Sequence, residues 1–188
     1  MASIITHIAV PLSLWAGLHS ASGRHRISNR LLVVACIASM LPDLDVIGFK
    51  FGIPYGSEFG HRGFTHSIGF SLFIGVFALF FHRYLQSSKL IIFSLLTLAT
   101  LSHAVLDAMT NGGLGVAFFW PLSDSRYFMP WQPIQVSPIG IKNFIGERGL
   151  RVLQSEFIWV WLPAISFSTT LLLTRFSLKK LLVRNNDS

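Results

Sequence analysis

Three short motifs contain the histidine and aspartate side chains that could do chemistry in this sequence. They read LPDLD at residues 41–45, HRGFTHS at residues 61–67 and SHAVLD at residues 102–107. Imidazole nitrogen and carboxylate oxygen together form a ligand set that suits Zn²⁺ or Mn²⁺. We therefore expect a site for one or two divalent ions. Its candidate ligands are Asp43, Asp45, His61, His66, His103 and Asp107, with His7 near the start of the chain.

The spacing within the motifs suits shared coordination. His103 and Asp107 are four positions apart, so on a helix both side chains point to the same side and could bind one ion together. Pro42 breaks or begins a helix, and the local turn could aim Asp43 and Asp45 inward. We therefore predict that the motifs present their side chains to one common site.

Taken singly, each of these side chains has an ordinary structural explanation. A single histidine in an apolar helix is more often a hydrogen-bonded core residue than a ligand, and a single aspartate is often an N-cap. For the whole set of residues this explanation is weaker. A charged group at membrane depth costs about 2.5–3.5 kcal/mol on insertion scales and usually marks function. We favour a metal site or a set of paired charges, supported by hydrogen bonds from Thr65 and Ser67 or by a helix cap there.

The composition predicts that membrane helices position the motifs. Of the 188 residues, 52% are hydrophobic and only 12% are charged, whereas soluble domains have about a quarter charged residues. We expect an all-α, polytopic transmembrane helix bundle of four to five spans, forming a single integral-membrane domain over residues 1–188. The candidate spans are residues 4–18, 31–48, 67–81, 90–109 and 157–174.

An alternating bundle of these spans places all three motifs on the same face. The second and fourth spans end there and the third begins there, as does the first span with His7. Hydropathy alone defines the spans, so the convergence of the motifs supports the topology independently.

Lysine and arginine residues indicate the orientation of the bundle, because they favour the cytoplasmic side. The face opposite the motifs carries more of them and only one acid, Asp187. Its basic residues are Arg24, Arg26, Arg30, Arg83, Lys89, Arg175, Lys179, Lys180 and Arg184. On the motif face they are Lys50, Arg62, Arg126, Lys142, Arg148 and Arg151. We therefore predict that the motifs lie on the extracytoplasmic face.

The longest connection, residues 110–156, is expected to be an interfacial loop on the same extracytoplasmic side. Its Gly-Gly, Trp-Pro and Pro-Trp pairs are typical of irregular backbone with aromatic anchors at the headgroup level. We expect Glu156 to be a loop charge, and a helix could form between about residues 142 and 156.

The charge balance fits a membrane better than a nucleic acid. The net charge is +7, but the basic residues lie between apolar segments and form no basic run with interleaved aromatic residues. The lipid bilayer is therefore the expected partner, and no nucleic acid is expected. Cys36 is the single cysteine, so it forms no internal disulfide. The sequence gives no indication of an oligomeric state.

At these motifs the chain resembles a known family. The strings LPDLD, GHRGFTHS and LSHAVLDAMTNGG, in this order and followed by FWP, are similar to those of the YdjM-like membrane-bound metal-dependent hydrolases of bacteria. The resemblance covers roughly residues 1–140. It implies a multi-pass protein of the bacterial inner (cytoplasmic) membrane, sometimes induced by DNA damage. It also implies a distant relation to zinc-dependent phospholipase C and P1-type nucleases, which cut phosphodiesters with clustered metals.

The resemblance also implies a ligand set, with zinc as the first metal to consider. The implied ligands are Asp43, Asp45, His61, His66, His103 and Asp107, and His7 matches a histidine near the N-terminus of the family.

We therefore expect a membrane-embedded metal-dependent hydrolase, acting on a phosphoester in a lipid or lipid-linked substrate. A bound metal would lower the pKa of a water molecule to about 7 and supply the nucleophile. Arg62 is expected to hold the phosphate and to stabilise charge in the transition state. Asp45, where the metal does not use it fully, could act as general base.

Two other functions use the same residues. A non-enzymatic protein could bind or transport metal ions or protons through the His/Asp cluster, although transport sites tend to lie near the membrane midplane. A structural protein could use the cluster only to tie helices together, and it would then hold no stoichiometric metal.

Overall fold

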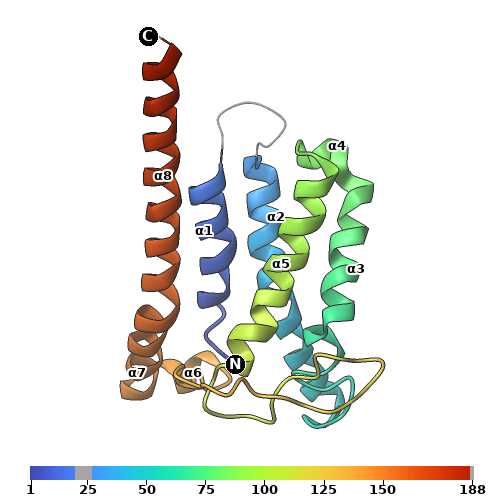
Figure 1. Ribbon diagram of the computed structural model, residues 1–188. Coiled ribbons are helices and arrows are strands. Elements are labelled where there is room, and N and C mark those ends of the chain that lie inside the picture. Colours follow the sequence, from blue (N-terminus) through green and yellow to red (C-terminus); the bar gives the residue numbers. More distant parts are fainter. Residues whose placement is uncertain (20–26, 187–188) are drawn as a thin grey trace.

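The computed structural model describes residues 1–19 and 27–186, and these residues form helices and loops with two isolated β-bridges but no β-strand. The helices stand side by side, with both ends of most of them at two common levels (Figure 1). Four described segments are long and apolar enough to cross a membrane, namely Asn29–Phe51, Ile68–Leu85, Lys89–Ala108 and Glu147–Ser177. The apolar segment Thr6–Leu18 is shorter. The predicted all-α bundle of four to five spans is therefore confirmed.

The first two helices run in opposite directions through the bundle. A 3₁₀ turn, Thr6–Ile8, leads into α1 (Ala9–Leu18). Helix α2 (Asn29–Met40) starts at Ser28, whose hydroxyl accepts a hydrogen bond from the backbone N–H of Leu31 at 3.0 Å. Arg24 and Arg26, which contribute to the predicted orientation, lie outside the described residues.

Pro42 changes the character of the second span. It stands at the start of a 3₁₀ helix, Leu41–Phe51, that continues directly from α2. The tighter winding of this segment carries both aspartates of the LPDLD motif, as the proline suggested, and it ends at Gly52, whose φ of 74° only glycine adopts readily.

Helices α3 and α5 pack closely against each other. Helix α3 (Ile68–Ala78) is capped by the Ser67 hydroxyl, as expected, and continues through a 3₁₀ turn, Leu79–Phe81, into α4 (His82–Leu85). Helix α5 (Lys89–Ala108) returns to the level at which α3 begins. A Cβ on Gly75 would lie 2.1 Å from Oγ1 of Thr97, so only glycine allows this approach. Small residues at such crossings are how helices pack in lipid.

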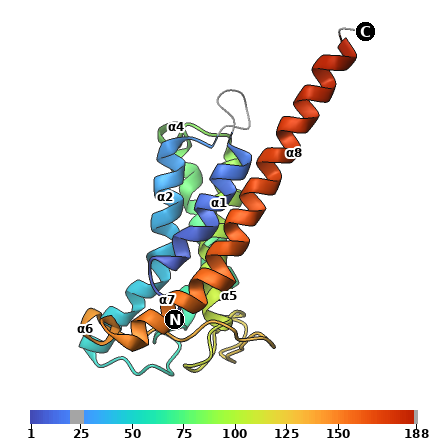
Figure 2. The ribbon, with the colours of Figure 1, turned by 90° about the vertical axis from the view of Figure 1, so that its left-hand side faces the viewer.

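The predicted loop at residues 110–156 is helical in its last third. After an irregular stretch come α6 (Ile141–Phe144) and α7 (Glu147–Glu156), and a π-helical segment, Phe157–Trp161, joins α7 to α8 (Leu162–Asn186). Helix α8 runs obliquely past α1, and its C-terminal end extends beyond the other helices (Figure 2).

The contact between α1 and α8 brings the last span onto the bundle. A Cβ on Gly17 would lie 2.8 Å from Cδ1 of Leu171, and the Ser168 hydroxyl donates to the carbonyl oxygen of Ser13 at 3.1 Å. Trp161, directly before α8, donates to the Thr6 hydroxyl at 3.3 Å, so the lower end of α8 lies beside the N-terminal segment.

Candidate metal centre

The three motifs meet at one end of the bundle, the lower end in Figure 1, where the N-terminus also lies. The aspartates come from the 3₁₀ helix after α2, two histidines from the turn before α3, and the last pair from the end of α5. The side chains of these residues are at most 2% exposed. The residues are His7, Asp43, Asp45, His61, His66, His103 and Asp107, which we call the His/Asp cluster.

All residues of the cluster except His7 fall into two groups that share one histidine. Asp43, His66, His103 and Asp107 each offer an atom within 4.8 Å of the others, and Asp45, His61 and His66 do the same. The predicted i, i+4 pair of α5 thus lies within one group. Either group is compact enough for one ion.

Hydrogen bonds of the other ring nitrogens set the tautomers of two central histidines. The Nδ1 atom of His103 lies 2.7 Å from the carbonyl oxygen of Ser39, which can only accept, so Nδ1 carries the proton. The Nδ1 atom of His66 lies 3.0 Å from the hydroxyl of Thr65, which donates its own proton to Asp45. Both Nε2 atoms are therefore left as acceptors.

These two acceptor nitrogens face each other at 3.1 Å, His66 Nε2 to His103 Nε2. In the neutral rings two lone pairs at this distance would repel, so a proton or a metal ion has to lie between them. Two nitrogens on one tetrahedral zinc ion would be separated by about 3.3 Å, given Zn–N bonds of 2.0–2.1 Å. The separation of the two rings therefore fits shared coordination.

Asp43 and His7 carry buried polar atoms that have no hydrogen-bond partner among the described residues. These are both carboxylate oxygens of Asp43 and both ring nitrogens of His7. Asp43 Oδ1 lies 3.4 Å from His103 Nε2, and Oδ2 lies 4.0 Å from His7 Nε2. The His7 ring stacks on that of His103 at 3.6 Å. Buried carboxylates are costly without partners, so these atoms also fit a bound cation.

Asp107 joins the N-terminal segment to the centre. Its Oδ1 accepts a hydrogen bond from the backbone N–H of Ala2 at 2.8 Å and lies 3.7 Å from His7 Nε2. Its Oδ2 accepts from Nε of Arg62 at 3.1 Å and lies 3.5 Å from His66 Nε2. Besides its hydrogen-bond donor, each carboxylate oxygen of Asp107 therefore has one histidine Nε2 atom nearby.

Asp45 differs from Asp43 because its oxygens are engaged by the protein. Oδ1 lies 2.6 Å from Nδ1 of His61, and Oδ2 accepts from the Thr65 hydroxyl at 2.9 Å and from the backbone N–H of Arg62 at 3.1 Å. The buried Nε2 of His61 has no partner among the described residues. A carboxylate that holds one ring nitrogen while the other is free is the usual arrangement behind a metal-bound histidine.

Arg62 is fully buried and donates to three protein acceptors. Besides Asp107, it donates to the hydroxyl of Thr110 and to the carbonyl oxygen of Gly112, both at 2.9 Å. Its backbone φ is 64°, a left-handed conformation that costs energy for a residue with a side chain and tends to persist at functional sites. The backbone carbonyl of Arg62 also accepts from Ala117, so the residue joins the motif to the loop.

The cluster carries more negative than positive charge. Three buried carboxylates, those of Asp43, Asp45 and Asp107, face the guanidinium of Arg62 and the N-terminal amino group, whose charge acts on Asp107. Burial by itself lowers the pKa of His66, but hydrogen bonds to Asp107 and Asp45 and their charges raise it to about 9, so without a metal ion this ring holds an extra proton. Both observations indicate that this space favours a cation, which is a proton where no metal ion is bound.

Glu156, which the sequence predicts to be a loop charge, is instead buried and holds the N-terminal segment beside the cluster. It is only 1% exposed, at the end of α7, and its carboxylate accepts from the backbone N–H of Ser3, from the Ser3 hydroxyl at 2.6 Å and from the Thr6 hydroxyl at 2.8 Å. It therefore fixes the segment that places Ala2 against Asp107 and begins the turn of His7. The spacing of Gly149, Val152 and Glu156 on one helix face, all buried, is the signal that could have revealed it.

Comparison with known proteins agrees with the motif resemblance and extends it. Residues 1–181 match the family model described as "YdjM inner membrane protein", beyond the roughly 140 residues that the motifs covered. A similar relative is "Inner membrane protein YbcI" of Escherichia coli (strain K12), which is 44% identical over 166 residues, or 88% of this chain and 94% of the relative. No solved structure matches the chain.

Proposed function

This chain belongs to the YdjM family of inner membrane proteins, and on that premise we propose that it is a membrane-embedded metal-dependent hydrolase. The observation that carries the proposal is the pair of acceptor nitrogens of His66 and His103, 3.1 Å apart in a buried space with excess negative charge. The proposed ligands of a first ion are these two histidines with Asp43 and Asp107, and His7 stands beside them. His66 has one free lone pair and can serve one ion only, so a second ion would depend on the free Nε2 of His61.

The donor set favours zinc, with manganese as the alternative. A divalent ion in this space would lower the pKa of a water molecule to about 7 and so supply a nucleophile for hydrolysis at neutral pH. The chain's own residues then have to keep the free ring nitrogens aimed at the ion. Ser39 does so for His103, and Thr65 does so for His66.

We assign positioning roles to Asp45 and Arg62. The general base and the phosphate contact that the sequence analysis expected of them require polar atoms free to meet the substrate. In this geometry Asp45 holds His61 and Thr65, and Arg62 holds Asp107. Truncating either residue would therefore act through the histidine or carboxylate that it orients, in addition to any direct contact with substrate.

The place of the cluster in the bundle supports a substrate with a phosphoester at the headgroup level of the membrane, in a lipid or a lipid-linked molecule. The cluster lies at the ends of α5 and the second span, beside the irregular loop, and away from the middle of the spans. We propose that this end faces the extracytoplasmic side, because Arg30, Arg83, Lys89 and Arg175 lie towards the other end.

The test is hydrolysis by the purified protein in detergent, with mixed micelles of phospholipid and with a chromogenic phosphodiester. Activity should disappear with a chelator, return with zinc or manganese, and be absent from His103→Ala. The matched control is His82→Ala, which removes a histidine from α4 at the other end and should leave activity unchanged. Activity that survives both the chelator and His103→Ala would refute the hydrolase.

One observation favours a second function, the binding or transport of ions. The rings of His7, His103, His66 and His61 form a continuous buried series, with neighbouring centroids 3.6, 4.7 and 5.6 Å apart. Such a series could relay protons or metal ions. Uptake of zinc or protons by proteoliposomes, lost in Asp107→Asn and without any hydrolysis, would favour this function over the hydrolase.

A further inference from the structure

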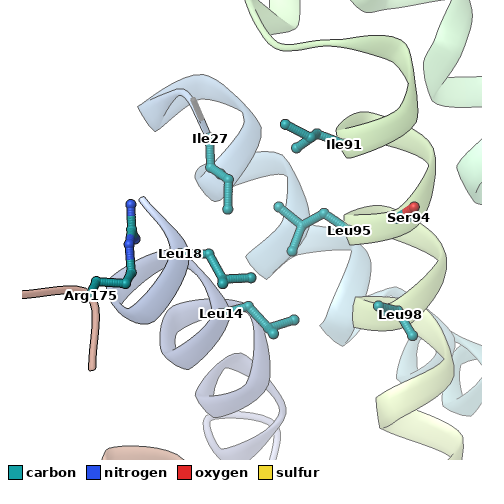
Figure 3. Close-up of a pocket in the computed structure, with 8 residues that line it drawn as sticks. All are labelled: Leu14, Leu18, Ile27, Ile91, Ser94, Leu95, Leu98 and Arg175. Atoms are coloured by element: carbon teal, nitrogen blue, oxygen red, sulfur yellow. The ribbon is translucent and has the colours of Figure 1, made fainter. Parts of the chain in front are cut away.

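An apolar crevice lies at the end of the bundle opposite the His/Asp cluster. Its walls are Leu14 and Leu18 of α1, Leu95 and Leu98 of α5, and Ile27 just before α2. In Figure 3 the side chains of Leu14, Leu18, Ile27 and Leu95 point toward one another. The space that the lining residues enclose has a volume of about 410 Å³. Residues of α1 and α5, with Ile27 before α2, therefore enclose one apolar space.

A single cation, Arg175 of α8, lines this crevice. Its Nη1 donates to the carbonyl oxygen of Gly17 at 2.8 Å and to that of His19 at 3.2 Å, which are the last carbonyls of α1. The residue is exposed, and no carboxylate of the described residues forms an ion pair with it. The hydrogen bonds hold the guanidinium at the C-terminal end of α1, and its charge has no carboxylate beside it among the described residues.

The surroundings add to this charge. The acidic residues of residues 1–19 and 27–186 all belong to the second span, the loop before α3, the end of α5, the long loop or α7, so the end of the described chain at the crevice carries none. Arg30 and Arg83 lie at the same end. An anion from outside the protein is therefore the complement that this end requires.

We propose that the crevice binds one anionic phospholipid, with an acyl chain between α1 and α5 and the phosphate at Arg175. The lining is apolar except for Arg175 and the Ser94 hydroxyl, which suits a hydrocarbon chain. A helix from another protein, about 10 Å wide with its side chains, is too large for this volume. The lipid joins α8 to α1 and α5 where α8 diverges from the bundle.

This site is independent of the proposed hydrolase. It lies at the other end of α1, α2 and α5 from the His/Asp cluster, and none of its residues contacts a proposed metal ligand. A lipid here is a structural ligand, so its loss leaves the chemistry of the metal centre intact.

The experiment is native mass spectrometry of the whole protein, delipidated in detergent and titrated with phosphatidylglycerol or phosphatidylethanolamine. The wild-type protein should bind one phosphatidylglycerol in preference to phosphatidylethanolamine. Since a basic residue near a lipid surface contributes about 1 kcal/mol, Arg175→Gln should reduce this preference about fivefold. The matched control is Arg83→Gln, an exposed cation of the same end that does not line the crevice.

Filling the crevice tests the acyl-chain half of the proposal. Leu98→Trp should weaken the binding of both lipids, because the larger side chain occupies the crevice. If this variant does not fold, Ser94→Phe fills the crevice from another position and should have the same effect. The proposal is overturned if wild-type protein shows no preference for phosphatidylglycerol, if Arg83→Gln lowers the preference as much as Arg175→Gln, or if folded, filled variants bind like the wild type.

Discussion

Replacing Glu156 by alanine should destabilise the protein strongly, although the residue is no proposed ligand. The carboxylate is 1% exposed and accepts hydrogen bonds from the backbone N–H of Ser3 and the hydroxyls of Ser3 and Thr6. Its removal leaves three buried donors without their charged acceptor. A buried donor left without an acceptor costs about 1–3 kcal/mol, so three such donors make a loss of about 3–5 kcal/mol or more the expected result. For a chain of this length that corresponds to a fall in Tm of roughly 6–20 °C.

Thermal unfolding followed by tryptophan fluorescence measures this effect directly. Trp161 donates to the hydroxyl of Thr6 at 3.3 Å, so it reports on the same contact. Glu156→Gln keeps one carbonyl acceptor and should lose roughly half as much stability. The variant Glu156→Ala should also retain less metal, because the segment that it frees holds Asp107 through Ala2.

Glu147→Ala is the matched control for this prediction. It removes a glutamate from the same helix, but the side chain is 91% exposed and its ion pair with Arg151 spans 3.6 Å. Such surface pairs contribute about 0–1 kcal/mol, so Tm should change by no more than a few degrees. Equal shifts for Glu156→Ala and Glu147→Ala would refute the idea that the buried carboxylate secures the N-terminal segment.

Three further predictions concern close approaches and the metal. Gly113→Ala should lower both Tm and metal content, because Gly113 has a φ of 95° and the added Cβ would lie 2.7 Å from Nη1 of Arg62. The control is Gly52→Ala, where φ is 74° but the added Cβ meets no atom, so only Tm should fall. Gly75→Ala should destabilise the α3–α5 pair by about 1–3 kcal/mol, and Gly56→Ala, with its nearest contact at 3.6 Å, should be neutral in the same unfolding assay. A chelator should lower Tm, and zinc added back at a hundred times its Kd should restore about 2.7 kcal/mol, roughly 5–10 °C.

The outcomes that contradict these predictions are as specific. Normal metal content in Gly113→Ala would show that metal binding does not depend on the present position of Arg62. Equal stability of the Gly75 and Gly56 variants would mean that a larger distance between α3 and α5 does not lower the free energy of unfolding. A Tm that is unchanged by the chelator in metal-loaded protein would show that the ion does not stabilise the fold.

The parts of the site that follow local spacing could be predicted from the sequence. The i, i+4 relation of His103 and Asp107 needs only a helix, and the hydropathy of that segment predicts one. The convergence of the motifs needs only alternating spans. Both follow from periodicity within a few turns of chain, and both are confirmed.

The parts that depend on distant partners could not be predicted. Asp43 and Asp45 look alike in the sequence, but the second is engaged by His61 and Thr65, which another motif supplies. Glu156 binds residues about 150 positions away, so its burial depends on the packing of α8 against α1. The internal hydrogen bonds of Arg62 likewise come from Thr110 and Gly112 in the loop after α5.

The most direct test of the metal centre is elemental analysis of the purified protein. We predict one or two divalent ions per chain, zinc first, lost in Asp43→Asn and retained in Asp124→Asn, which changes an exposed aspartate of the loop. Asp43 is the informative position because both of its buried oxygens lack a hydrogen-bond partner among the described residues. Wild-type protein without stoichiometric metal, even after incubation with zinc and manganese, would contradict the account.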